Sequence, residues 1–147
     1  MYKHILIPTD GSKTAELAVK NGLAFARSIR AKVTGFTAVP EYQPPSESEL
    51  MSRTAISMRE HEKRAKKKAE TLLKKVEGRA RTAGVKCDTD YALSDRPYEA
   101  IIRAAEKHGC DLIFIASHGR RGLSALLHGS QTQAVLTRSR IPTLVYR

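Results

Sequence analysis

An unbroken apolar run stands at residues 111–116, where the chain reads Asp-Leu-Ile-Phe-Ile-Ala. A strand with one face in water shows alternating apolar and polar residues, whereas a continuous run indicates a strand covered on both faces. Strands of that kind lie inside parallel sheets whose two faces carry helices. The run therefore predicts a parallel α/β fold with residues 111–116 as a central strand.

Short β-like runs alternate with longer helical patterns on either side of this strand. Further strands are predicted at 4–7, 32–39, 85–92 and 142–146. The predicted helices cover 13–29, 57–83 and 97–108, with a last one that ends near 140, and the polar connection 41–56 is left without assigned structure. We expect a single domain over residues 1–147, a Rossmann-like three-layer α/β/α sandwich around a five-stranded parallel sheet.

Local signals mark the ends of the helices. Ser12 is a suitable N-cap for the first helix, and Gly84 is a suitable residue to end the long basic one. Pro97 is expected in the first turn of its helix, where the amide has no partner to lose.

The formal net charge of +11 raises the question of an acidic partner. Much of the charge lies in 57–83, which holds ten Lys or Arg residues, with apolar residues at three- and four-residue spacing between them. This pattern favours a surface helix with a solvated basic face. Nucleic-acid binding through 57–83 is the alternative, but no aromatic residues stand among the charges to stack on bases, so we do not expect it.

Bulk properties narrow the class of protein further. No apolar run reaches the roughly 20 residues that a membrane-spanning helix needs, and the N-terminal segment does not resemble a signal peptide. We therefore expect a cytoplasmic protein. Cys87 and Cys110 are far apart and outside any C-x-x-C spacing, so we expect small apolar residues and neither a disulfide nor a metal site.

Two predicted strands end in unusual loops. Residues 8–11 read Pro-Thr-Asp-Gly and residues 116–119 read Ala-Ser-His-Gly. Open parallel sheets bind ligands beyond the carboxyl ends of their strands, at the point where the winding direction reverses. If these two strands are neighbours at that point, both loops open into one crevice.

The segment from 119 to 132 contains residue types that are typical of a phosphate-binding site. Gly119 and Gly129 let the backbone approach a ligand, and residues 130–132, Ser-Gln-Thr, would stand at a helix N-terminus, near the positive charge of Arg120. Two turns and a capped helix explain the same residues equally well. The chain has no Walker A or G-x-G-x-x-G motif, so neither a P-loop ATPase nor a dinucleotide oxidoreductase is supported.

Several segments together resemble the universal stress protein family. They are Ile-Leu-Ile-Pro-Thr-Asp-Gly-Ser at 5–12, Ala-Ser-His-Gly-Arg-Arg-Gly-Leu-Ser at 116–124, Gly-Ser at 129–130 and Ile-Pro-Thr-Leu-Val-Tyr at 141–146. The resemblance spans the chain and implies a five-stranded parallel sheet of the adenine nucleotide alpha hydrolase-like type, with dimers paired through the last strand. One branch of the family binds ATP through G-x₂-G-x₉-G-[ST], and another has lost this motif.

On this sequence the second motif glycine matches Gly119, and nine residues separate it from Gly129 and Ser130. The first glycine falls on Ala116. Alanine there would cost about 1–2 kcal/mol if the backbone must be left-handed, but little if it is extended. The resemblance implies a nucleotide site with Asp10 near the ribose or the phosphates and Val39 near adenine. The full set is Pro8, Thr9, Asp10, Val39, Ala116, Ser117, Gly119, Arg120, Gly129, Ser130, Gln131 and Thr132.

The leading hypothesis is a small stress-response sensor or regulator that binds ATP, with or without Mg²⁺, and forms a homodimer through residues 143–146. No residue is assigned a catalytic role, and hydrolysis would at most be slow. His118 is expected to form hydrogen bonds in its loop, and Asp10 has the simpler alternative of stabilising its turn. A nucleotide-free dimeric interaction protein of the same fold is the second hypothesis, and Ala116 is the feature in its favour.

Overall fold

The computed structural model describes residues 1–117 and 129–147. In chain order its helices and strands are β1 (His4–Pro8), α1 (Lys13–Ile29), β2 (Lys32–Val39), α2 (Glu47–Met51), α3 (Met58–Ala83), β3 (Cys87–Leu93), α4 (Pro97–Lys107), β4 (Leu112–Ala116), α5 (Gly129–Arg138) and β5 (Thr143–Tyr146).

The five strands form one parallel sheet in the order β3-β2-β1-β4-β5. Ile5 of β1 stands opposite Val33 of β2 on one side and opposite Leu112 of β4 on the other. Every residue of β1 and β4 is buried, as expected for strands covered on both faces. The predicted five-stranded parallel sheet, with 111–116 near its centre, is confirmed.

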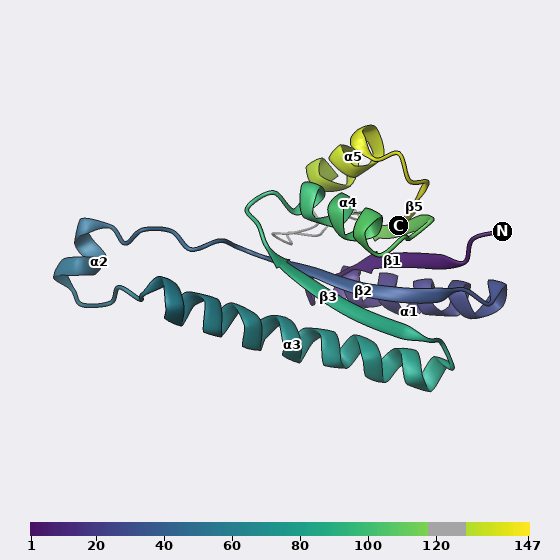
Figure 1. The fold of residues 1–147 in the computed structure, drawn as a ribbon, viewed down its shortest axis with the longest axis horizontal. Coiled ribbons are helices and arrows are strands. Elements are labelled where there is room, and N and C mark those ends of the chain that lie inside the picture. Colours follow the sequence, from purple (N-terminus) through teal and green to yellow (C-terminus); the bar gives the residue numbers. More distant parts are fainter. Residues whose placement is uncertain (118–128) are drawn as a thin grey trace.

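Helices cover both faces of this sheet (Figure 1). Helices α1 and α3 pack side by side on one face, where α1 contacts β1 and β4 and α3 contacts β2 and β3. Helices α4 and α5 pack against each other on the opposite face. The core between the layers is aliphatic, and Ile5, Leu6 and Ile7 at its centre are fully buried. The predicted three-layer arrangement is confirmed.

Capping residues set where α1 and α3, the two helices on one face of the sheet, begin. Ser12 accepts a hydrogen bond from the Ala15 amide at 3.2 Å and begins α1, as predicted. Ser57 accepts one from the Glu60 amide at 3.1 Å and begins α3, which ends at Gly84 in the left-handed conformation.

The third strand begins later than predicted, at Cys87 instead of residue 85. The amide of Val85 donates to the Ala80 carbonyl at 2.9 Å and so completes the C-terminal cap of α3. Val85 is therefore tied to the last turn of α3, and the strand starts two residues later, after Lys86, whose carbonyl accepts from the Val33 amide of β2 at 2.9 Å.

The connection between β2 and α3 contains the short helix α2, which the sequence did not predict. A capping box holds it: the Ser46 side chain accepts from the Glu49 amide, and the Glu49 carboxylate accepts from the Ser46 amide. This segment and the N-terminal half of α3 project beyond the sheet (Figure 1). In the part of the chain that the structure describes, no helix is both long and apolar enough to span a bilayer.

Candidate functional site

Three strand ends meet at the carboxyl edge of the sheet. Strands β2, β1 and β4 are neighbours, so Val39, residues 9–10 and residues 116–117 follow one another along this edge. The chain winds outward from β1 through β2 to β3, and in the other direction from β4 to β5. The winding direction therefore reverses between β1 and β4, the position where open parallel sheets bind ligands.

The loop after β1 is held by its own side chains. Pro8 is the buried last residue of β1, and the buried Thr9 donates its amide to the Phe36 carbonyl at 2.8 Å. One carboxylate oxygen of Asp10, Oδ1, accepts from the Ser12 amide at 2.9 Å. Gly11 has a φ of +79°, which the tight turn requires. Asp10 thus stabilises this turn, as the simpler sequence interpretation supposed, and uses one of its two oxygens to do so.

Ala116 is the fully buried last residue of β4 and lies opposite Tyr146 of β5. Among the non-glycine residues that the structure describes, only Arg30 and Arg53 have a positive φ. Ala116 is therefore extended, and its methyl group carries none of the left-handed strain considered from the sequence. The amide of the next residue, Ser117, donates to the Tyr146 carbonyl at 2.8 Å.

Helix α5 begins beside this strand end. The Thr132 hydroxyl is buried and donates to the Ala116 carbonyl at 3.0 Å, which fixes the first turn of α5 against the end of β4. A Cβ built at Gly129 would meet no atom of the described residues within 4 Å. The first described turn of α5, residues 129–132, holds no acidic residue, and the amides at a helix N-terminus attract anions.

Two predicted phosphate-lining side chains have structural partners instead. The Gln131 side-chain carbonyl accepts from the Tyr98 amide at 3.1 Å and caps the first turn of α4. The Thr132 hydroxyl is committed to Ala116. From these two residues the helix therefore offers a ligand backbone amides, whereas the exposed Ser130 offers its hydroxyl as well.

Val39 lies at the same edge, but its side chain faces away from α5. It is buried against Ala65 and Ala69 of α3, and its carbonyl accepts from the Ser94 amide at 2.8 Å. His118, Gly119 and Arg120 lie outside the described residues. The structure thus brings together Pro8, Thr9, Asp10, Ala116, Ser117 and the start of α5, with Val39 one strand away.

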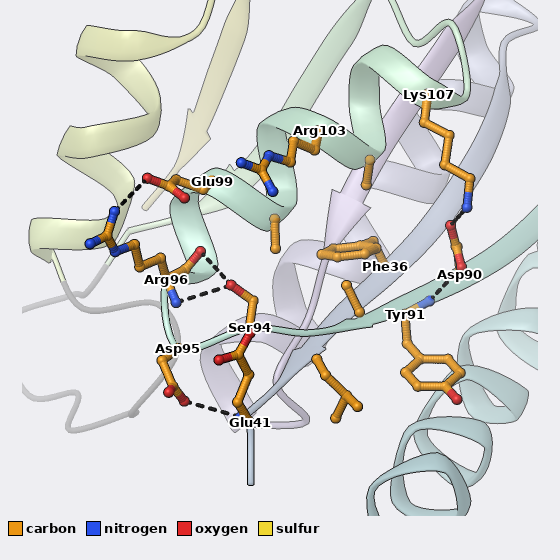
Figure 2. Close-up of a pocket in the computed structure, with 14 residues that line it drawn as sticks. Phe36, Glu41, Asp90, Tyr91, Ser94, Asp95, Arg96, Glu99, Arg103 and Lys107 are labelled. Carbon is orange, nitrogen blue, oxygen red and sulfur yellow. Dashed lines mark hydrogen bonds and ion pairs between the residues drawn. The ribbon is translucent and has the colours of Figure 1, made fainter. Parts of the chain in front are cut away.

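A cavity of about 590 Å³ opens between β3 and α4, at the flank of the sheet (Figure 2). Its lining includes Phe36 at the base and the charged Asp90, Asp95, Arg103 and Lys107, and none of the predicted site residues. The sequence analysis missed this pocket. The helix residues that line it recur at three- and four-residue spacing between 96 and 107, which predicts a shared face but not a hollow beneath it.

The charges around this flank pocket are largely paired with each other. Asp90 accepts from Lys107 Nζ at 2.9 Å and from His108 Nε2 at 2.8 Å, and Arg96 pairs with Glu99 at 3.1 Å. Burial raises the pKa of Asp90, but the hydrogen bonds from His108 and Lys107 outweigh it and hold this pKa below its ordinary value. Such a lining selects no single charge of ligand, so the flank pocket is a weaker candidate than the edge between β1 and β4.

The cysteines and the acidic residues give no sign of redox or metal chemistry where the chain is described. Cys87 and Cys110 are free thiols. Burial raises the pKa of Cys110 to about 11, so it stays protonated and packs as an apolar group. Within residues 1–117 and 129–147, no group of three or more His, Cys, Asp or Glu side chains could hold a metal ion.

Comparison with known proteins places this geometry in context. A sequence model described as the universal stress protein family matches residues 1–147. The universal stress protein MJ0577 of Methanocaldococcus jannaschii is 31% identical, over 100% of this chain and 96% of its own length. Its solved structure superimposes with a TM-score of 0.75 and covers 99% of this chain and 95% of that one.

Two further solved structures share the fold and were determined with nucleotides. A universal stress protein in complex with cAMP has a TM-score of 0.73 at 23% identity, with 99% of this chain and 97% of that chain covered. The universal stress protein from Archaeoglobus fulgidus in complex with dAMP has a TM-score of 0.67 at 16% identity, with 99% and 98% covered.

Proposed function

The chain belongs to the universal stress protein family, and from that premise we propose that it binds an adenine nucleotide, ATP in particular, between the carboxyl ends of β1 and β4. Relatives of the same fold form complexes with cAMP and with dAMP, which supports this class of ligand. In this chain the winding direction of the sheet reverses between β1 and β4, the position where open parallel sheets bind ligands.

The hydrogen bond from Thr132 to the Ala116 carbonyl is the observation that carries the proposal. It holds the first described turn of α5 beside the end of β4, next to the reversal point, where the amides of a helix N-terminus would face a phosphate. Ala116 is extended, and its methyl group is accommodated in the strand without strain. The residue that departs from the family's ATP motif therefore carries no left-handed strain in this chain.

We assign roles from the polar groups that each described residue does not already use in a structural hydrogen bond. The phosphates would lie on the amides and hydroxyl at Gly129 and Ser130, with Gly119 and Arg120 completing the motif. The second carboxylate oxygen of Asp10 would reach the ribose or the phosphates. The backbone at Val39 would lie near adenine, because its side chain is occupied by α3. Pro8, Thr9 and Ser117 would form the floor, and Mg²⁺ would enter with the phosphates that it coordinates.

We propose a role as a sensor or regulator in a stress response, in the cytoplasm and as a homodimer paired through β5. Hydrolysis would be slow, because Asp10 is the one acidic residue placed at the proposed site among those described, and its Oδ1 is held by Ser12. Metal-assisted hydrolysis needs side chains that hold the metal, and within the described residues no group of three or more His, Cys, Asp or Glu side chains could do so.

A nucleotide-free interaction protein of the same fold is the second candidate. The observation in its favour is Ala116, since the family's ATP motif has glycine there. The two candidates differ in one property, the presence of nucleotide in the purified protein.

The test is to denature the purified protein by heat, identify released nucleotide by HPLC, and titrate the emptied protein with ATP and Mg²⁺ in a calorimeter. We expect adenine nucleotide in the supernatant, or a saturable heat signal, and loss of that signal in Gly129→Val. Gly78→Val is the matched control, because both glycines are helical and neither would bring a new Cβ within 4 Å of another described atom. No released nucleotide and no heat at millimolar ATP would overturn the proposal in favour of the second candidate.

A further inference from the structure

A surface groove lies between α1 and α3. These two helices cover the face of the sheet opposite α4 and α5 (Figure 1). The volume of the groove is about 500 Å³. Helix α1 contributes Lys20 and Leu23, and α3 contributes Lys75, Gly78, Arg79 and Ala83. None of these residues belongs to the proposed nucleotide site, so this α1–α3 groove is a separate feature of the molecule.

The rim of the α1–α3 groove is cationic. Lys20, Lys75 and Arg79 are all exposed. Arg79 lies 3.6 Å from Glu16, whereas Lys20 and Lys75 make no ion pair with any residue that the structure describes. Helix α3 has ten Lys or Arg residues against four Glu, and the chain has a net charge of +11. A partner at this rim would therefore gain from negative charge.

The floor of the groove is apolar. Leu23 lies at the bottom but is only 2% exposed, so the floor that a partner can touch is formed mainly by Gly78 and Ala83. A Cβ built at Gly78 would meet no atom of the described residues within 4 Å, so the space above this residue is open. Gly78 and Ala83 keep the surface of α3 low where it faces the groove. Side chains of a second helix can enter such a hollow, as ridges of one helix enter the grooves of others.

An apolar floor between cationic rims matches an amphipathic helix with acidic flanks. Its apolar side chains would lie on Gly78 and Ala83, and its carboxylates would reach the rim. A nucleic-acid strand would use the rim but not the floor, and no aromatic side chain among the described lining residues could stack on bases. We propose that the α1–α3 groove is the docking site for an acidic amphipathic helix of a partner protein.

The experiment uses a stapled, fluorescent peptide of about 14 residues, long enough to span the paired helices, with leucines on one face and glutamates on both flanks. We expect saturable binding to the full chain with a Kd of roughly 10–100 μM, weakening as salt screens the rim charges. A peptide of the same composition with its leucines distributed around the helix should bind at least about tenfold more weakly, because it cannot fill the floor.

Three variants locate the site. Gly78→Leu fills the open space without a clash and should abolish binding of the peptide, whereas Gly78→Ala should retain most of it. Lys75→Glu should weaken binding by about tenfold. Lys63→Glu is the matched control, since it makes the same charge change on α3 outside the groove and should have little effect. Circular dichroism checks that each variant is folded.

Three outcomes would overturn the proposal. The first is no binding of the acidic peptide, and the second is equal weakening by Lys63→Glu and Lys75→Glu, which would show attraction to the charge of α3 alone. The third is displacement of the peptide by a single-stranded oligonucleotide that itself loses affinity in Lys75→Glu, which would assign the groove to nucleic acid. None of these results depends on nucleotide binding between β1 and β4.

Discussion

Ala116 is the residue on which the proposed nucleotide site depends most. It replaces the first glycine of the family's ATP motif, and a requirement for a left-handed backbone there would count against binding. The structure removes this objection, since Ala116 is extended within β4, and its carbonyl holds the first turn of α5 through Thr132.

Restoring the motif with Ala116→Gly should therefore gain little. We expect the Kd for ATP to change by less than about threefold, and the free energy of unfolding to fall by about 0.5–1 kcal/mol because glycine is less favourable than alanine in a strand. Calorimetry with ATP and urea denaturation measure the two effects. An affinity gain of an order of magnitude would show instead that the alanine methyl obstructs the site.

His4 makes stability depend on pH. It is buried at the start of β1, with Nε2 2.7 Å from the Thr34 hydroxyl. Burial, together with the nearby Lys32 charge, lowers the pKa of His4 below its ordinary value of 6.5. As the pH falls below 6.5, His4 takes up a proton in the unfolded chain but not in the folded chain. The free energy of unfolding therefore decreases until the pH reaches the lower pKa that His4 has in the folded chain.

His4→Gln should flatten this dependence, because glutamine can still bond Thr34 but does not titrate. Urea denaturation at about pH 7.5 and about pH 5 measures it, and His61→Gln serves as the control at a partly exposed histidine with the same chemistry. If His4→Gln loses as much stability over this range as the unsubstituted protein, His4 is not the titrating group.

The layer of α1 and α3 rests on close approaches between the helices and the sheet. A Cβ added at Gly22 in α1 would come within 2.7 Å of Ile7 Cδ1 and 3.1 Å of Phe114 Cδ1, whereas one added at Gly78 in α3 would meet no atom within 4 Å. Gly22 therefore sets how closely α1 packs on β1 and β4, and Gly78 has no such role.

The same substitution should have opposite effects at these two helical glycines. Gly22→Ala should lower the free energy of unfolding by about 1–3 kcal/mol through overpacking. Gly78→Ala should raise it by about 0.5–1 kcal/mol, because alanine favours the helix and meets nothing. Thermal or urea denaturation of both variants decides the matter, and destabilisation of similar size at both positions would refute the packing account.

Elements built on local chemistry could be predicted from the sequence, and those that depend on distant partners could not. The buried strands follow from unbroken apolar runs, and α1 from its cap at Ser12. The side-chain roles of Gln131 and Thr132 depend on the Tyr98 amide and the Ala116 carbonyl, which only the folded chain brings near. The flank pocket shown in Figure 2 was not predicted either, because it also depends on residues that only the folded chain brings together.

At the level of the assembly, β5 is an open edge of the sheet. The carbonyls of Pro142 and Tyr146 accept hydrogen bonds from the amides of Ile113 in β4 and of Ser117 directly after it. Since backbone groups alternate in direction along a strand, those of Thr143 and Val145 point to the open side. An unpaired edge of this kind is available to a second copy of the same strand.

Val145→Pro should separate the proposed dimer into folded monomers. Proline removes an amide that faces the open edge and leaves the bonds to β4 in place, a position that strands tolerate. Size-exclusion chromatography with light scattering measures the mass, and circular dichroism the fold. A dimer that persists in this variant would place the contact elsewhere than β5.

If an adenine nucleotide binds between β1 and β4, the backbone amides at this edge of the sheet must change their chemical shifts when ATP and Mg²⁺ are added. We expect the largest, saturable shifts at Asp10, Ser117 and the first turn of α5 near Ser130. We expect little change at Arg103 and Lys107 in the flank pocket. Shifts confined to those two residues, or no shifts at millimolar ATP, would contradict nucleotide binding at this edge.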